Sequence, residues 1–262
     1  MKKILYPLVF LMILCVTLPL LAVDVDEDNK YVIVETKLYT VHWNKPAQMG
    51  YMQAFVGDSD ESIINTGGRS FYHSSDYGGW KDWGQLQEWD ILEEGGGKAV
   101  VQYVSKDAGN KEYTCVAHYY DSVPYIKHEV TVTADGGAVT SFQSGHEPMF
   151  EMNGTNEGIQ VFKDPFPHGV YWTGSGFFGA IYGPDAQDAR NHNTRMDLVH
   201  DSVGENLKDG DSATITYYVA FAEGDATDAN ALAQDVQDEP AGEAVSPVDS
   251  LATTWSQIRT RH

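Results

Sequence analysis

Cysteine is scarce in this chain, which has only two among its 262 residues. Cys15 lies inside an apolar run at the N-terminus, and Cys115 lies in the strand-like stretch Tyr113-Thr114-Cys115-Val116-Ala117. If the apolar run is removed, the one remaining cysteine cannot form an internal disulfide. A disulfide-stabilised scaffold is therefore excluded for the mature part, and Cys115 is expected to be a buried, inert thiol.

Basic charge is also scarce, because 17 Lys and Arg residues stand against 38 Asp and Glu residues. The formal net charge of −21 becomes −23 if Lys2 and Lys3 are removed with the N-terminal run. A surface this acidic repels nucleic acid and anionic lipid, so neither is an expected partner. A polyanionic polymer would approach only where basic side chains are concentrated.

The chain lacks the local motifs of several enzyme classes. It has no His-x-x-x-His or His-Glu-x-x-His spacing for zinc, no phosphate-binding glycine loop and no nucleophile elbow. Acidic turns at 58–61 and at Asp185 and Asp188 offer oxygen ligands for calcium, but neither has the fixed spacing of a calcium loop. No metal and no cofactor is therefore predicted.

The first 22 residues have the pattern of a secretory signal. Lys2 and Lys3 precede an apolar run over 4–21, and the run ends at the small residue Ala22. Its length approaches the ~20 residues of a membrane span, so an uncleaved anchor is the alternative. Prolines within the run and acidic residues directly after it favour cleavage. We expect export across a bacterial-type inner membrane and a secreted or periplasmic mature protein that begins near Val23 and is not held in the membrane.

Strand patterns dominate from residue 31 onward. Short runs rich in Val, Ile, Thr and Tyr alternate with turns rich in Gly, Asp and Asn. The turn Asp209-Gly210-Asp211 is expected to join two paired strands as a hairpin. These features predict an all-β fold, a large antiparallel β-sandwich. The clearest predicted strands are 31–36, 38–42, 99–104, 113–119, 126–133, 158–162, 177–182 and 213–222.

Helix patterns appear only near the C-terminus. Residues 227–238 contain good helix formers, with Leu232 and Val236 four residues apart behind a Thr/Asp cap. Pro240 then interrupts the chain, and residues 251–258 carry apolar positions at helical spacing. We expect a signal over 1–22, one β-sandwich domain over 23–240, and a linker with a short helix over 241–262. That helix is expected to pack on the body, with an exposed docking tail as the alternative.

The middle of the chain resembles the strands of galactose-mutarotase-like supersandwich domains. The resemblance rests on Glu88–Gly95, Ala99–Tyr103 and Tyr119–Val132, where one strand ends in the turn Pro124-Tyr125 and the next alternates apolar and charged residues. Such domains occur in sugar epimerases and in several polysaccharide lyases. The likeness extends in rhythm over roughly residues 85–222 and implies a large sandwich with a carbohydrate ligand. The epimerases' Asn-His-x-x-Phe-Asn motif is absent, since Asn191-His192 matches only its first two residues.

Arginine is gathered beside histidine. Of five arginines, two lie in the last four residues, and the other three each stand within four residues of a histidine. Arg69 is followed by His73, while Arg190 and Arg195 flank His192. Arginine binds carboxylates through a rigid fork of donors, and histidine can act as an acid or a base near neutral pH. This pattern indicates a site for an anionic group, unless these arginines simply pair with the abundant acids.

Aromatic residues crowd the segment 71–89, which holds three of the six tryptophans. Its glycines and polar residues indicate an irregular surface segment. Aromatic faces in such a segment can stack against a pyranose ring. The alternative is a long loop that its own aromatic side chains pin to the sandwich. The candidate substrate-binding residues are Arg69, Tyr72, His73, Trp80 and Trp83.

These features together predict a secreted carbohydrate-active protein, similar to a polysaccharide lyase, that binds or cleaves an acidic glycan. In β-elimination, arginine neutralises the uronate carboxylate and a base removes the acidified proton beside it. The candidate catalytic residues are Arg190 and Arg195 as neutralisers, His192 or His146 as base, and Tyr171 or Tyr72 as acid. The alternative is a non-catalytic carbohydrate-binding or structural envelope domain. His118 and His128 lie in predicted strands and are expected to be structural, and nothing in the sequence indicates an oligomeric state.

Overall fold

The computed structural model describes most of the chain between residues 23 and 238. The described ranges are 23–46, 50–64, 71–75, 81–82, 84–106, 109–139, 146–151, 160–162, 169–174, 176–183, 186–192, 195–200 and 206–238. They contain 17 strands and one helix, which confirms the predicted all-β class. The predicted signal over 1–22 and the helix expected over 251–258 lie outside the described residues.

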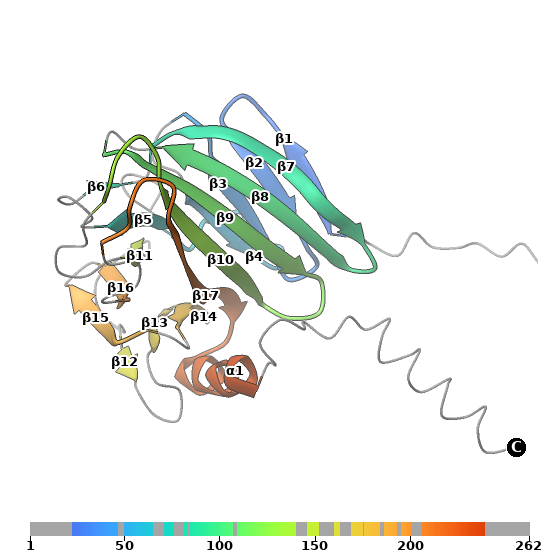
Figure 1. The fold of residues 1–262 in the computed structure, drawn as a ribbon. Coiled ribbons are helices and arrows are strands. Elements are labelled where there is room, and N and C mark those ends of the chain that lie inside the picture. The colour runs from blue at the N-terminus through green and yellow to red at the C-terminus, as the bar shows by residue number, and fades with distance from the viewer. Residues whose placement is uncertain are drawn as a thin grey trace, which may run out of the picture.

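The strands form three antiparallel sheets (Figure 1). The four-stranded sheet has the order β1 (Asp24–Glu27), β2 (Tyr31–Glu35), β3 (Tyr39–Asn44) and β4 (Tyr51–Val56). The eight-stranded sheet has the order β12 (Gln160–Phe162), β13 (Gly169–Gly174), β14 (Phe177–Tyr182), β17 (Ser212–Glu223), β10 (Tyr125–Ala134), β9 (Lys111–Tyr120), β8 (Lys98–Lys106) and β7 (Leu86–Gly95). The five-stranded sheet has the order β15 (Asp188–His192), β16 (Arg195–Val199), β11 (His146–Glu151), β5 (Phe71–Ser75) and β6 (Lys81–Asp82).

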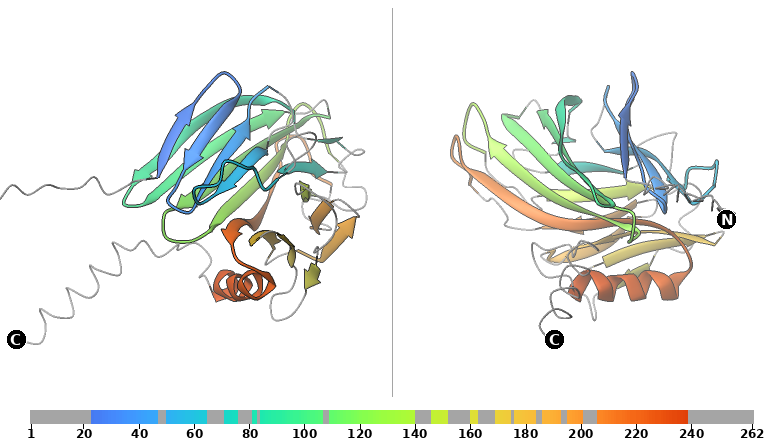
Figure 2. Two further views of the ribbon diagram at one scale, coloured as in Figure 1. Left: turned by 180° about the vertical axis from the view of Figure 1, so that it is seen from behind. Right: turned by 90° about the vertical axis from the view of Figure 1, so that its right-hand side faces the viewer.

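A single hydrophobic core joins the three sheets. It contains Val34 and Val41 of the four-stranded sheet, Val101 and Ile181 of the eight-stranded sheet, and Leu198 of the five-stranded sheet. The four-stranded sheet lies across this core from the long strands of the eight-stranded sheet, so the molecule is a sandwich (Figure 2). Strands such as β2 and β9 contribute alternate residues to the core because successive side chains point to opposite faces.

Strand β9 shows how the sequence pattern produces this burial. Its residues alternate between buried and half-buried positions along most of its length. Tyr113, Cys115, Ala117 and Tyr119 all point into the core. Cys115 is a free, buried thiol, as expected. Burial raises its pKa well above the usual value, so the reactive thiolate is suppressed.

The core between the four-stranded and eight-stranded sheets holds a network of hydroxyl groups. The Tyr119 hydroxyl lies 3.0 Å from that of Tyr51 and 2.8 Å from that of Tyr103. The Tyr51 hydroxyl also lies 2.8 Å from Nε2 of the fully buried His128. Buried polar groups cost free energy unless they are hydrogen-bonded, and here each hydroxyl has a partner. His128 is therefore a structural residue, as predicted.

Helix α1 (Ala226–Asp238) confirms the predicted helix. Asp225 caps it, because its Oδ1 accepts the N–H of Thr227 at 2.6 Å, while Oδ2 of Asp228 accepts the N–H of Asp225 at 2.9 Å. Leu232 and Val236 pack in a second apolar cluster on the face of β14 that is turned away from the main core (Figure 1).

One turn differs from its prediction. The turn 209–211 was expected to close a hairpin, but β17, which follows it, pairs with β10 and β14. Asp209 instead accepts the N–H groups of Gly136 and Gly137 at 2.9 and 3.0 Å, and Leu207 forms an isolated bridge with Val139. The hairpin prediction is wrong because local turn chemistry cannot show which distant strand supplies the partner.

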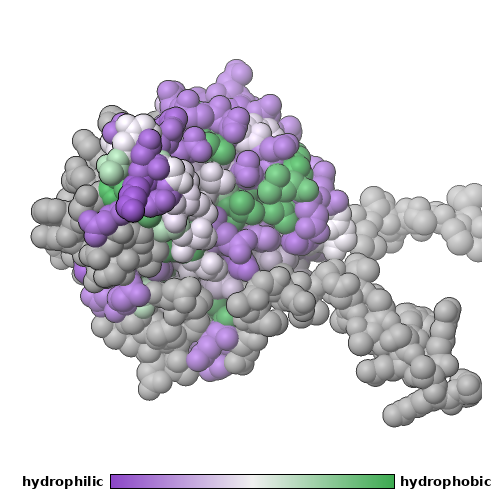
Figure 3. Space-filling view, viewed as in Figure 1, coloured by the Kyte–Doolittle hydropathy of each residue, from purple (hydrophilic) through white to green (hydrophobic). Residues whose placement is uncertain are grey.

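The described surface is mostly polar. Hydrophilic residues cover much of the face seen in Figure 3. Leu92, which is 51% exposed, is the one large hydrophobic side chain exposed in the described part of the chain. No helix within the described ranges has both the length and the apolar character needed to cross a bilayer.

Candidate functional site

The five-stranded sheet brings together the two segments that the sequence singled out. Strand β5 comes from the aromatic segment, while β15 and β16 carry the arginines and the histidine between them. In the sheet, β16 and β5 both pair with β11, which separates them. Segments about 120 residues apart in sequence therefore lie within a few strands of each other.

The register arranges their residues in rows across the sheet. One row runs from Arg190 through Asp197 and Met149 to Tyr72. Neighbouring strands lie about 4.8 Å apart, so the row spans about 14 Å. The adjacent parallel row contains His192, Arg195 and Glu151. Positions in register share a face of the sheet, as do positions two residues apart on one strand, so both rows occupy the same face.

The segment around His192 is a β-hairpin, whereas its small polar residues Asn191, Asn193 and Thr194 favour a loop over a buried strand when the sequence is taken alone. Strands β15 and β16 pair from Asp188 with Val199 to His192 with Arg195, leaving two residues between them. The small polar residues suggested irregular structure, but alternate positions are apolar. Met196 and Leu198 are fully buried in the main core. This burial of one face holds the segment as strands. On the face that carries the rows, Arg190 is about one-third exposed, whereas Asp197 and Val199 are buried.

Arg190 has a carboxylate partner within its own strand. Its Nε lies 3.3 Å from Oδ2 of Asp188, and both side chains are about one-third exposed. Asp197, which stands opposite Arg190 in register, is only 1% exposed. The alternative considered for these arginines, pairing with the protein's own acids, therefore applies to Arg190. Its positive charge is partly compensated before any ligand binds.

The other candidates fall into three groups. His146 lies three positions before Met149 in β11, and His73 lies one position after Tyr72 in β5. Register therefore assigns both histidine positions to the opposite face of the sheet. Tyr171 lies in β13 of the eight-stranded sheet, in register with Gln160 and Ala180. The third group, Arg69, Trp80 and Trp83, lies outside the described residues.

One aromatic residue of the crowded segment is used for structure. The Trp89 indole donates a hydrogen bond to Oε2 of Glu27 at 3.2 Å, and that oxygen also lies 2.6 Å from Nζ of Lys45. Trp89 is partly buried against the main core. It therefore ties β7 to β1 at the edge of the sandwich. For this residue, the interpretation of an aromatic side chain pinned to the body is the correct one.

His118 is also placed by a protein partner. Its Nε2 lies 2.9 Å from Oε2 of Glu129, whose other oxygen lies 3.6 Å from Nζ of Lys127. Desolvation lowers the pKa of His118, while the hydrogen bond to Glu129 acts in the opposite direction. This cross-strand pair confirms the prediction that His118 is structural.

Two acidic residues that share these rows are not among the candidates predicted from the sequence. Asp197 stands beside Arg190, and Glu151 stands beside Arg195. The alternation Arg-Met-Asp-Leu-Val over 195–199 is the signal for a half-buried strand that could have found Asp197. Among the described residues, no three His, Cys, Asp or Glu side chains converge as metal ligands.

Gly183 controls the approach of the chain to this hairpin. A Cβ at this position would lie 2.8 Å from Cβ of Ala186 and 2.9 Å from Cδ1 of Leu198. Replacement of Gly183 by Ala should therefore lower the free energy of unfolding by about 1–3 kcal/mol, measured by urea unfolding. Adding Ala186→Gly removes one of the two contacts and should recover part of the loss. Wild-type stability of the single variant would contradict this packing.

Solved structures with this fold include carbohydrate-active enzymes. No protein-family model and no curated protein sequence matches the chain. An alpha-mannosidase from Enterococcus faecalis V583 is similar with a TM-score of 0.53 and 9% identity, over 78% of this chain and 30% of the enzyme. A GH36 alpha-galactosidase from Geobacillus stearothermophilus has a TM-score of 0.51 and 9% identity, over 77% of this chain and 41% of the enzyme.

These likenesses define the class of fold. The chain spans about a third of the length of the two enzymes, and 9% identity carries no information on chemistry. A polysaccharide lyase with a TM-score of 0.48 is too loosely similar to add to the assignment. The predicted resemblance to galactose-mutarotase-like supersandwich domains is confirmed as a resemblance of fold. The protein is an antiparallel β-sandwich of a kind that occurs within carbohydrate-active enzymes.

Proposed function

We propose that this protein binds an acidic glycan along the rows of the five-stranded sheet and cleaves it by β-elimination. The observation that carries the proposal is the sheet order, which places the hairpin of His192 and Arg195 in one sheet with Tyr72. A row of about 14 Å suits an extended polymer better than a single small molecule.

Arg195 is the proposed carboxylate-binding residue. Arg190 is already paired with Asp188, so its main role is to set the electrostatic potential beside the row that contains His192 and Arg195. In a chain with a formal net charge of −21, an anionic polymer needs a local concentration of positive charge. Arg195 and His192 stand opposite each other at the end of the hairpin and provide it.

The elimination then needs one base. His192 removes the proton beside the sugar carboxylate, whose charge Arg195 neutralises. The electron pair forms the carbon–carbon double bond as the glycosidic carbon–oxygen bond breaks. The leaving oxygen takes a proton from solvent or from Tyr72, the acid candidate that lies on this sheet. The products are an unsaturated uronate end and a free hydroxyl, so no oxidant or cofactor is consumed.

A panel of uronic-acid polymers tests the reaction, because the unsaturated product absorbs in the ultraviolet. His192→Ala should lower turnover by about 10²–10⁴-fold while largely preserving binding, since it deletes a base. Arg195→Ala should weaken both binding and turnover, because the carboxylate is held in the ground state and in the transition state. Lys98→Ala removes one positive charge from the eight-stranded sheet and should change neither.

The same experiment separates the alternatives. Binding to an acidic glycan that depends on Arg195, without an absorbance rise on any polymer, would contradict the lyase proposal and support a carbohydrate-binding domain. Absence of binding to every glycan would contradict both and leave a structural envelope domain. Equal effects of Arg195→Ala and Lys98→Ala would show that only net charge matters.

A further inference from the structure

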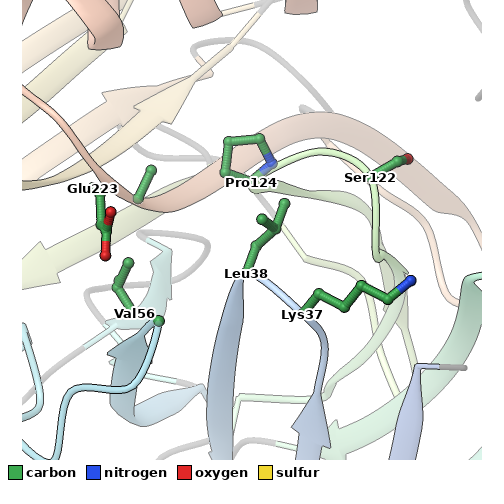
Figure 4. Close-up of a pocket in the computed structure, with 8 residues that line it drawn as sticks. Lys37, Leu38, Val56, Ser122, Pro124 and Glu223 are labelled. Carbon is green, nitrogen blue, oxygen red and sulfur yellow. The ribbon is translucent and has the colours of Figure 1, made fainter. Parts of the chain in front are cut away.

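A pocket lies apart from the five-stranded sheet. It has a volume of about 470 Å³, and all the residues that line it belong to the four-stranded and eight-stranded sheets or their turns (Figure 4). Its apolar walls are Leu38, Val56, Pro124 and Ala222. The volume falls in the range of small-molecule sites, which combine apolar walls with a few polar groups.

Glu223 supplies a carboxylate at one side of this pocket. It has no hydrogen-bond or ion-pair partner in the part of the chain that the structure describes. Gly57 lies beside it, and a Cβ at Gly57 would lie 3.0 Å from Oε1 of Glu223, so an added methyl group would push the carboxylate aside by a few tenths of an ångström. Gly57 also has a φ of +57°, which favours glycine. The turn after β4 therefore leaves room for this carboxylate at the pocket wall.

Lys37 supplies donors at the other side (Figure 4). Its Nζ lies 3.4 Å from Oδ2 of Asp121, whose side chain is only 7% exposed. Oδ1 of Asp121 also accepts the backbone N–H of Lys37 at 3.2 Å. The lysine charge is thus balanced, while an ammonium group with three N–H donors retains donors for a ligand. The hydroxyl of Ser122, beside Lys37, can donate or accept.

We propose that this pocket binds an amino sugar, with its ammonium group on Glu223. Because Asp121 balances Lys37, Glu223 is the charge of this pocket without a counter-charge among the described residues, and it selects a positive group. The Lys37 and Ser122 donors match ring hydroxyls, which a simple alkyl amine lacks. The aliphatic walls accept the apolar face of a pyranose ring. This site is independent of the acidic-glycan site, since it shares no residue with the rows of the five-stranded sheet.

Calorimetric titration with a trimer of unacetylated glucosamine tests the proposal, at a pH where the amine is protonated. The N-acetylglucosamine trimer is the matched ligand, since it keeps the ring and hydroxyls but not the charge. We expect the unacetylated trimer to bind at least tenfold more tightly. Glu223→Gln should remove that difference. Gly57→Ala keeps the charge but obstructs the carboxylate, and should weaken binding in a protein whose melt shows it to be folded.

Because the chain has a formal net charge of −21, a charge-matched control is essential. Glu93→Gln neutralises an exposed acid on β7 that pairs with Lys98 of β8, and it should leave binding unchanged. Equal losses for Glu93→Gln and Glu223→Gln would overturn the proposal in favour of general attraction to the surface. Equal affinity for the two trimers would also overturn it. Binding of trilysine with the same dependence on Glu223 would show that the pocket selects an ammonium group and not a sugar.

Discussion

Acidification from pH 7 to pH 4 is expected to lower the free energy of unfolding by about 3 kcal/mol through His128 alone. This imidazole is fully buried, and its ring stacks on Tyr217 with 5.0 Å between centroids. Desolvation lowers its pKa from 6.5 to about 3, partly offset by a hydrogen bond with the backbone of Ile126. The folded protein therefore keeps His128 neutral under conditions that protonate it in the unfolded chain.

The sign follows from which state binds the proton. Because the folded pKa lies below the unfolded one, the unfolded state binds more protons between pH 6.5 and 3. The contribution of His128 to the free energy of unfolding is fully present above about pH 6.5 and decreases as the pH falls towards 3. Below pH 3 both states are protonated, and the loss from this residue is complete.

Urea unfolding at several pH values, with wild type beside His128→Gln, measures this contribution. The variant cannot titrate in this range, so its stability should depend less steeply on pH. Tyr103→Phe is the matched control, since it removes a hydroxyl that lies 2.8 Å from that of Tyr119 in the same network. It should cost about 1 kcal/mol at every pH. Parallel pH profiles for wild type and His128→Gln would contradict the assignment.

Replacement of Trp43 by Ala should have a comparable effect, lowering the free energy of unfolding by about 3–5 kcal/mol. Trp43 is fully buried in β3. Its ring stacks on that of Tyr103, with 4.0 Å between centroids and 9° between planes, and Tyr51 packs edge-on at 4.9 Å. Because Tyr103 belongs to β8, this contact joins the four-stranded sheet to the eight-stranded sheet.

Thermal and urea unfolding of Trp43→Ala, followed by near-ultraviolet circular dichroism, would measure the loss. Leu92→Ala is the control, because Leu92 is 51% exposed and its removal should change stability by less than about 0.5 kcal/mol. Trp43→Phe keeps an aromatic ring and should fall between the two. Similar losses for Trp43→Ala and Leu92→Ala would show that the stacked pair does not hold the sheets together.

The local elements could be predicted from the sequence because their signals are local. Short runs rich in β-branched and aromatic residues, bounded by turn residues, identified strands such as 113–119 and 177–182, which the structure confirms within β9 and β14. Helical spacing and a polar cap identified α1. The scarcity of cysteine indicated that the fold is stabilised by packing and not by disulfides. The alternating rhythm over 85–222 was also sufficient to predict the resemblance of fold.

Only the tertiary structure decided which strands meet. The sheet order that places β15 and β16 beside β11 and β5 depends on contacts between distant segments, which no local pattern encodes. In the core, the aromatic residues that join the layers are Trp43, Tyr51 and Tyr103, while Trp89 of the segment 71–89 ties β7 to β1 at the edge of the sandwich. Likewise, the pairing of Arg190 with Asp188 and the position of Glu223 at the pocket wall are properties of a packed surface. The sequence by itself determined the class of fold and the scarcity of positive charge, because both follow from the composition and from the spacing of apolar residues along the chain. The positions of the two candidate sites followed only from folding, because each is built from segments that the fold brings together.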